Sequence, residues 1–132
     1  MIALDTNVLL RVLLDDDKAQ AQHARRLLEF HCSAERPAFV NRAVFCEALW
    51  TLVRGCRYNH EQVCSAVELL LAAPALAIED ADAVEEALTA FRGSQAGFVD
   101  VLVGVLNRRA GCITTYTFDR RAAATPDFSV VD

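Results

Sequence analysis

The chain begins with MIALDTNVLLRVLL at residues 1–14, where a short apolar run meets a polar triplet and then a second apolar run. Residues 2–4 predict a short strand, because the turn-forming triplet at residues 5–7 stops the apolar run. Residues 8–14 predict a helix beyond that turn. A strand that leads directly into a helix is the repeating unit of α/β folds. The opening residues therefore indicate an α/β fold if the rest of the chain repeats this unit.

The rest of the chain does repeat it, because short apolar or β-branched runs alternate with longer segments of helical apolar spacing. The expected strands are 2–4, 38–40, 76–78, 112–116 and 128–131. The expected helices are 8–14, 18–31, 41–55, 60–73, one that opens at Asp80 or Asp82, 98–109 and a short turn at 120–124. Such alternation favours parallel pairing. We expect a three-layer α/β/α sandwich around a central, mostly parallel sheet of about five strands.

Composition supports one folded domain over residues 1–132, because 54% of the residues are hydrophobic and 23% are charged. No apolar run reaches the roughly 18 residues of a membrane span, and the first residues lack the features of a signal peptide. We therefore expect a cytoplasmic protein. The net charge of −5 argues against a protein that coats nucleic acid by bulk electrostatics, although it is compatible with a nuclease.

The five cysteines are odd in number, scattered, and free of any Cys-x-x-Cys pair. This pattern favours reduced thiols in the core over a disulfide framework or a zinc site. The residues are Cys32, Cys46, Cys56, Cys64 and Cys112.

Four carboxylates stand at positions that an α/β fold gives to functional groups. Asp5 and Asp119 each follow an expected strand, although either could simply cap the helix after it. Asp100 begins a helix that is apolar nearly all round, which indicates a buried helix and makes an unpartnered charge costly. Glu47 flanks the apolar stripe of its helix, where an exposed glutamate needs no special explanation.

The set of four carries more information than any one of its members. All four could converge on one edge of the sheet, where they would repel one another and could not all ionise without counter-charge. A hard divalent cation supplies that charge, and magnesium prefers oxygen ligands. Such an ion activates water and stabilises the charge that develops in phosphodiester cleavage.

Four segments resemble those of the PIN-domain nucleases, and in particular the VapC-type toxins of bacterial toxin–antitoxin systems. The similarity covers essentially the whole chain in order and spacing, and a PIN-like fold is what it implies. The segments are Asp5-Thr6-Asn7-Val8-Leu9-Leu10, Val44-Phe45-Cys46-Glu47-Ala48-Leu49, Phe98-Val99-Asp100-Val101-Leu102 and Thr117-Phe118-Asp119-Arg120.

The resemblance implies magnesium or manganese held by Asp5 and Asp100, with Glu47 and Asp119 completing the site directly or through water. It implies metal-dependent endonucleolytic cleavage of RNA that leaves a 5′-phosphate, a homodimer, and inhibition by a cognate antitoxin protein. The polar residues beside these acids are then supporting groups, with capping as the alternative for the first two. They are Thr6, Asn7 and Thr117.

Basic residues near the acids are candidates for gripping RNA, with an ordinary solvated surface as the alternative. Arg120 and Arg121 follow Asp119, and Arg108 and Arg109 end the Asp100 helix. Trp50 lies off its helix's apolar stripe and could anchor a protein partner or fill a peripheral core position.

Two other protein classes, one of phosphatases and one of signalling modules, fit the sequence poorly. A dehalogenase-like phosphatase or a receiver module needs paired acids after the first strand, and Asn7 occupies the second position. A non-catalytic PIN-like module that binds protein or RNA remains the alternative to the nuclease.

Overall fold

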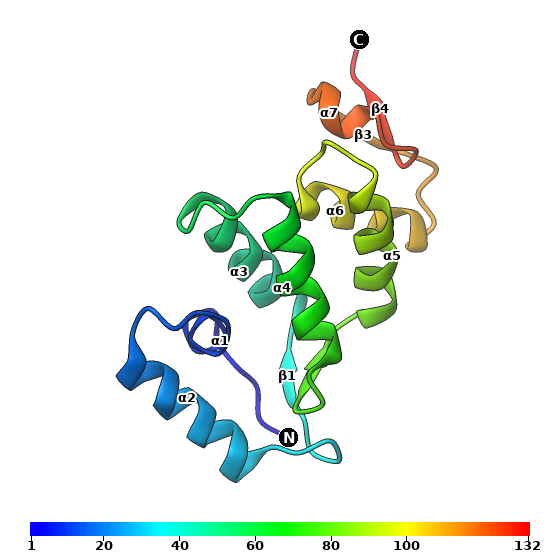
Figure 1. Ribbon diagram of the computed structural model, residues 1–132. Coiled ribbons are helices and arrows are strands. Elements are labelled where there is room, and N and C mark those ends of the chain that lie inside the picture. Colours follow the sequence, from blue (N-terminus) through cyan, green and yellow to red (C-terminus); the bar gives the residue numbers. More distant parts are fainter. The chain divides into compact units, whose positions relative to one another are not determined.

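The computed structural model describes residues 1–132, which form seven helices and four short strands (Figure 1). The elements are α1 Thr6–Leu13, α2 Lys18–His31, β1 Ala38–Val40, α3 Arg42–Arg54, α4 His60–Ala72, β2 Leu76–Ile78, α5 Ala81–Arg92, α6 Phe98–Arg109, β3 Thr115–Thr117, α7 Arg120–Ala123 and β4 Phe128–Val130. The chain divides into two compact units, residues 1–81 (unit 1) and residues 82–132 (unit 2). None of the helices has the length and apolarity that crossing a membrane requires.

The sheet of unit 1 pairs β1 with β2 in parallel, with Val40 opposite Ile78. The first residues add a parallel bridge between Ala3 and Phe39 on the other side of β1. There the Phe39 N–H donates to the Ile2 carbonyl at 2.8 Å, and the Leu4 N–H donates to the Phe39 carbonyl at 3.0 Å. The strand expected at residues 2–4 is therefore present as a bridge, whereas those at 38–40 and 76–78 are confirmed.

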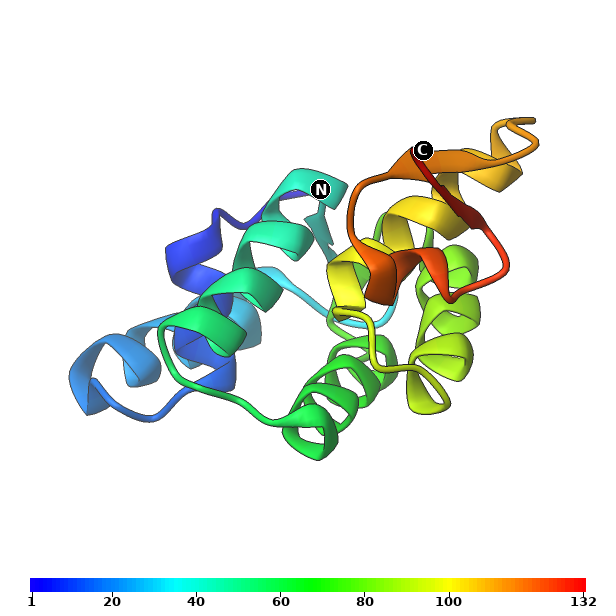
Figure 2. The same cartoon turned by 90° about the horizontal axis from the view of Figure 1, so that it is seen from above.

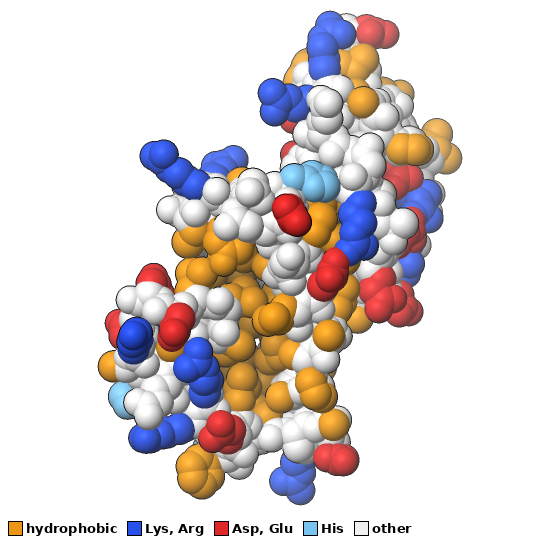
Figure 3. All heavy atoms as spheres, viewed as in Figure 1, with side chains coloured by type: hydrophobic (Ala, Val, Ile, Leu, Met, Phe, Trp, Pro, Cys, Tyr) orange, Lys and Arg blue, Asp and Glu red, His pale blue; other side chains and the backbone are white.

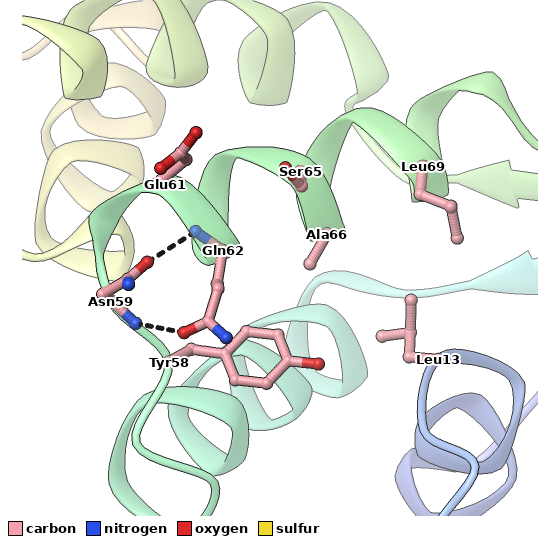
Figure 4. Close-up of a pocket in the computed structure, with 8 residues that line it drawn as sticks. All are labelled: Leu13, Tyr58, Asn59, Glu61, Gln62, Ser65, Ala66 and Leu69. Carbon is pink, nitrogen blue, oxygen red and sulfur yellow. Dashed lines mark hydrogen bonds between the residues drawn. The ribbon is translucent and has the colours of Figure 1, made fainter.

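The helices of unit 1 are amphipathic, and they bury apolar side chains around this sheet. Leu9 of α1, Leu52 of α3 and Leu70 of α4 are completely buried. Asparagine and aspartate start the helices by accepting backbone N–H groups. At the start of α4, Asn59 and Gln62 cap each other's backbone reciprocally, as Figure 4 shows. Local capping and apolar spacing thus act together in this unit.

Unit 2 contains α5 and α6 and a parallel pair of strands, with Thr115 opposite Phe128. Helix α7 packs against both strands, and Figure 2 shows it beside them. Gly104 of α6 allows close packing, because a β-carbon there would stand 2.4 Å from Cε2 of Phe128. The strand expected at 112–116 was placed too early, because Gly111 has a φ of +101° and residues 110–114 still form the exit from α6.

The five expected strand segments thus occur as two separate parallel pairs and one bridge. One central sheet of five strands, in a single domain, remains a prediction.

All five cysteines are free thiols, but the expectation that they lie in the core was wrong for most of them. Only Cys64 is buried, while Cys56 and Cys112 are exposed. Partial burial of the Cys46 side chain raises the pKa of its thiol, and the nearby positive charge of Arg42 opposes that rise.

Candidate active site

Asp5 lies where the first strand segment ends and α1 begins. Its backbone is extended, and its Oδ1 accepts the N–H of Thr6 at 2.8 Å. The neighbouring Leu4 and Thr6 are buried, whereas Asp5 itself is exposed. Asp5 is therefore the N-cap of α1, and the second oxygen of its carboxylate has no hydrogen-bond partner within unit 1.

Asn7 is exposed on the first turn of α1 and lines a groove between α1 and α2 of about 560 Å³. Its side chain makes no hydrogen bond that would identify it as the cap of α1. The capping alternative is therefore met by Asp5, and Asn7 is left available at the groove.

Glu47 lies on α3, which begins directly after β1. Asn41 caps this helix by accepting the Val44 N–H at 2.8 Å. Phe45, Ala48 and Leu49 of α3 are buried, and Glu47 is exposed beside them. Its carboxylate takes part in no ion pair. The helix core thus fixes the backbone of Glu47 and leaves its carboxylate in solvent.

A basic and acidic cluster lies at the carboxyl edge of the unit 1 sheet. The strand register places Asp5, Asn41 and Glu79 in one row, one residue beyond the pairs that end the strands. Glu79 Oε1 accepts the backbone N–H of Arg42 at 2.8 Å, and Arg42 Nε lies 3.0 Å from Asp80 Oδ2. The hydrogen bond from Arg42 lowers the pKa of Glu79. This cluster was missed by the sequence analysis, although both acids follow a strand as Asp5 does.

Asp100 lies in the first turn of α6, and its surroundings differ from the expectation. The helix is not buried all round, because Val103 is 39% exposed and Asp100 itself is exposed. Asp100 Oδ2 lies 3.2 Å from the position that a β-carbon on Gly97 would take. The carboxylate therefore folds back over the start of its helix, where the helix dipole favours a negative charge. The expectation that Asp100 is a charge on a buried helix was therefore wrong.

Asp119 is exposed and lies between β3 and α7. Its Oδ1 accepts the N–H of Arg121 at 2.8 Å, and its own N–H donates to Thr117 Oγ1 at 3.0 Å. The Thr117 hydroxyl therefore orients the backbone of Asp119. As at Asp5, the acid caps the next helix with one oxygen and leaves the other without a hydrogen-bond partner.

The basic candidates separate into two groups. Arg108 is paired with Glu86 and Asp127, and Arg109 Nη2 lies 2.9 Å from Glu86 Oε1. Arg120 and Arg121 form no ion pair and are exposed. The last two are thus the ones whose guanidinium groups remain available for a phosphate.

Each unit holds two of the four expected acids, Asp5 and Glu47 in unit 1 and Asp100 and Asp119 in unit 2. Across the chain, no three side chains of histidine, cysteine, aspartate or glutamate come together in a way that could hold a metal ion. Ion pairs do engage other acids, among them Asp15, Asp16, Glu79, Asp80, Glu86 and Asp127. The structure therefore shows where each expected acid stands, and it leaves their meeting in one site as a proposal.

The sequence of residues 2–127 matches the protein family described as the PIN domain. This match covers nearly the whole chain. The chain belongs to the PIN-domain family. PIN domains are α/β sandwiches that are typically metal-dependent nucleases acting on RNA or other nucleic acid, so the family supports a hydrolase of nucleic acid. Comparison with curated proteins gives no match.

As a PIN domain, the chain has one continuous family match that crosses the boundary between its two units at residues 81 and 82. All four expected acids lie inside the matched segment. The α/β alternation from the first strand segment to β4 agrees with the family.

Proposed function

We propose that this PIN-domain protein is a magnesium- or manganese-dependent endoribonuclease and the toxin of a VapBC-type toxin–antitoxin system. The proposal includes one domain over residues 1–132, in which the strand segments of both units join in a central sheet of about five strands. One observation carries it: the family match runs without interruption across both units and includes every one of the four acids.

In the proposed site, Asp5 and Asp100 hold the metal, and Glu47 and Asp119 complete the acidic set. The chemistry of these donors fits the ion, since hard divalent cations favour carboxylate oxygens. Asp5 and Asp119 each spend one oxygen on a backbone N–H, at 2.8 Å in both cases, and keep the other for a ligand. Neither these two acids nor Glu47 is neutralised by an ion pair. A divalent ion bound there supplies Lewis acidity and lowers the pKa of a bound water.

The chain's own residues position this chemistry. The N–H groups of Thr6 and Arg121 fix the rotamers of Asp5 and Asp119, and the hydroxyl of Thr117 fixes the backbone of Asp119. Asn7 lies two residues after Asp5 on the first turn of α1, where its exposed side chain is available to support a ligand. Acids that are held in place lose less conformational entropy when the site forms.

The proposed partners are RNA, a cognate antitoxin and a second copy of the chain, in the cytoplasm. Exposed apolar side chains support protein partners, because Trp50 is 51% and Leu69 is 57% exposed. Figure 3 shows hydrophobic side chains gathered between α1 and α4, where Leu13, Ala66 and Leu69 line a groove of about 430 Å³. The guanidinium carbon of Arg54 lies 4.8 Å from the ring centre of Trp50. Trp50 therefore does not fill a peripheral core position.

The test is cleavage of a labelled single-stranded RNA by the full chain with magnesium or manganese. We expect cleavage that stops in chelator and falls by at least about 100-fold in Asp5→Asn and in Asp100→Asn, since a metal site contributes several kcal/mol to the transition state. Glu35→Gln is the matched control, because Glu35 is an exposed acid without an ion pair. Equal cleavage by wild type and both folded aspartate variants would reject the site.

The alternative function is a non-catalytic module that binds protein or RNA. It predicts no cleavage with either metal and no rise in melting temperature when manganese is added. A metal that binds the folded state stabilises it. Thermal unfolding with and without manganese, for wild type and Asp100→Asn, therefore separates the two functions without relying on an RNA target.

A further inference from the structure

A groove of about 600 Å³ in unit 2 combines two arginines that form no ion pair with neutral polar groups. The end of α5 and the loop after it form one side, and α7 with the residues that follow forms the other. No acidic residue lines it. The lining polar residues are Ser94, Gln95, Arg120, Arg121 and Thr125.

The two arginines give this groove positive charges that no ion pair in unit 2 neutralises. Arg108 and Arg109, in the same unit, are held by Glu86 and Asp127. Arg120 and Arg121 have no such carboxylate, although the chain as a whole carries a net charge of −5. Guanidinium groups bind phosphate through paired N–H donors. An anionic ligand with phosphate oxygens therefore suits the groove.

The neutral residues offer hydrogen bonds of both kinds. Ser94 Oγ accepts the Ala96 N–H at 3.0 Å, which leaves its own hydrogen free to donate. Thr125 Oγ1 donates to the Ala122 carbonyl at 2.7 Å, which leaves its lone pairs free to accept. The exposed amide of Gln95 makes no hydrogen bond and can both donate and accept. Such a set suits the edge of a base or a ribose next to the phosphate.

We propose that this groove binds one nucleotide of single-stranded RNA beside the cleavage site, with Arg120 and Arg121 on a phosphate and Gln95 on the base or ribose. The volume lies in the range of small-molecule sites, which suits one unstacked nucleotide. The place also fits, because Arg120 directly follows Asp119. This inference rests on the proposed nuclease function and adds a substrate-positioning site to it.

The test measures binding of a fluorescent single-stranded RNA to the full chain in chelator, where no metal-dependent cleavage occurs. Affinity is followed over a range of salt concentrations. Each phosphate contact contributes about 0.7 to the slope of log affinity against log salt for single strands. We expect Arg120→Gln with Arg121→Gln to reduce the magnitude of the slope by about 0.7, because both guanidinium groups bind the same phosphate.

The matched control is Arg26→Gln with Arg36→Gln, which removes the same charge from exposed arginines of unit 1 that form no ion pair. Its slope is expected to equal that of wild type. Gln95→Ala is expected to weaken binding by about 2- to 10-fold, the equivalent of one hydrogen bond, without changing the slope. Circular dichroism checks that every variant is folded.

The groove is rejected as the nucleotide site if the two double variants have equal slopes, or if wild type does not bind the RNA at all. An unchanged affinity of Gln95→Ala would reject the role of Gln95. These outcomes differ from failure of the nuclease proposal. RNA binding that depends on Arg120 and Arg121 without any cleavage in magnesium or manganese would reject catalysis alone.

Discussion

In both units a candidate acid caps the helix that follows it. The two units differ in how many residues of the neighbouring strands are buried. In each unit one acid follows a strand segment and caps a helix, Asp5 in unit 1 and Asp119 in unit 2. In each unit a second acid lies exposed on a helix. The strands of unit 1 bury two of their three residues, whereas β3 and β4 of unit 2 bury none. Helix α1 has eight residues and α7 has four.

Local hydrogen bonds therefore orient a carboxylate in both units, whether or not the strands beside it are buried. Ile113, Tyr116 and Phe118 around β3 are strongly exposed, and such side chains favour burial against further structure. Burial of these side chains against further structure would therefore stabilise unit 2.

The largest loss of stability is expected for Leu52→Ala in α3 of unit 1. Leu52 is completely buried, so the substitution removes contacts and leaves a cavity that costs about 2–5 kcal/mol. Urea unfolding followed by circular dichroism measures the loss. Leu69→Ala is the control, because Leu69 is 57% exposed and its removal is expected to change stability by less than about 0.5 kcal/mol.

The same unfolding experiment tests the proposal of one domain. If both units fold together, Leu52→Ala lowers a single transition that includes the amide protons of unit 2 in hydrogen exchange. Two transitions, with unit 2 unaffected by the substitution, would contradict a single cooperative domain.

An intermediate effect is expected for Gly104→Ala in α6. A β-carbon at this position would stand 2.4 Å from Phe128 Cε2 and 3.1 Å from Asp127 Cβ, so the Phe128 ring or the segment that carries it must shift. Overpacking costs about 1–3 kcal/mol, and the better helix propensity of alanine returns up to about 1 kcal/mol. We expect a net loss of about 1 kcal/mol in urea unfolding. Gly93→Ala is the control, since nothing lies within 4 Å of its β-carbon position.

The smallest effect is expected for Glu79→Gln, and it depends on pH. Contact with Arg42 lowers the pKa of Glu79 below its usual value of 4.5. The ionised carboxylate therefore stabilises the fold above its unfolded pKa, and this contribution is lost as the pH falls through the lower pKa of the folded state. The variant should be less stable than wild type at neutral pH and equally stable in acid. A difference that stays constant from neutral to acidic pH would contradict this role.

Most helices and the strands of unit 1 could be predicted because their signals are local. The segments at 18–31, 38–40, 76–78 and 98–109 have the bounds that apolar spacing and capping residues indicate. The strand around Tyr116 was placed too early, because β-branched residues favour a strand without showing where the exit from α6 ends. Which strands pair in one sheet depends on contacts between distant segments, and no local pattern encodes these.

The candidate site was predictable in its positions and less so in its environment. Acids after strand segments were expected at Asp5 and Asp119, and both are there with a second role as caps. The prediction that Asp100 lies on a buried helix was wrong. An apolar sequence around a residue does not show how much of the helix surface other elements cover. The cluster of Arg42, Glu79 and Asp80 was missed, since it joins residues 37 apart in sequence.

The cap at Asp5 has an evolutionary consequence. An asparagine at this position has the same oxygen to offer the Thr6 N–H, so replacing the acid would remove a proposed metal ligand and leave the start of α1 intact. Aspartate and asparagine codons differ by a single base. A lineage with this architecture could therefore give up catalysis in one step and survive as a folded pseudoenzyme, free to be selected for binding alone.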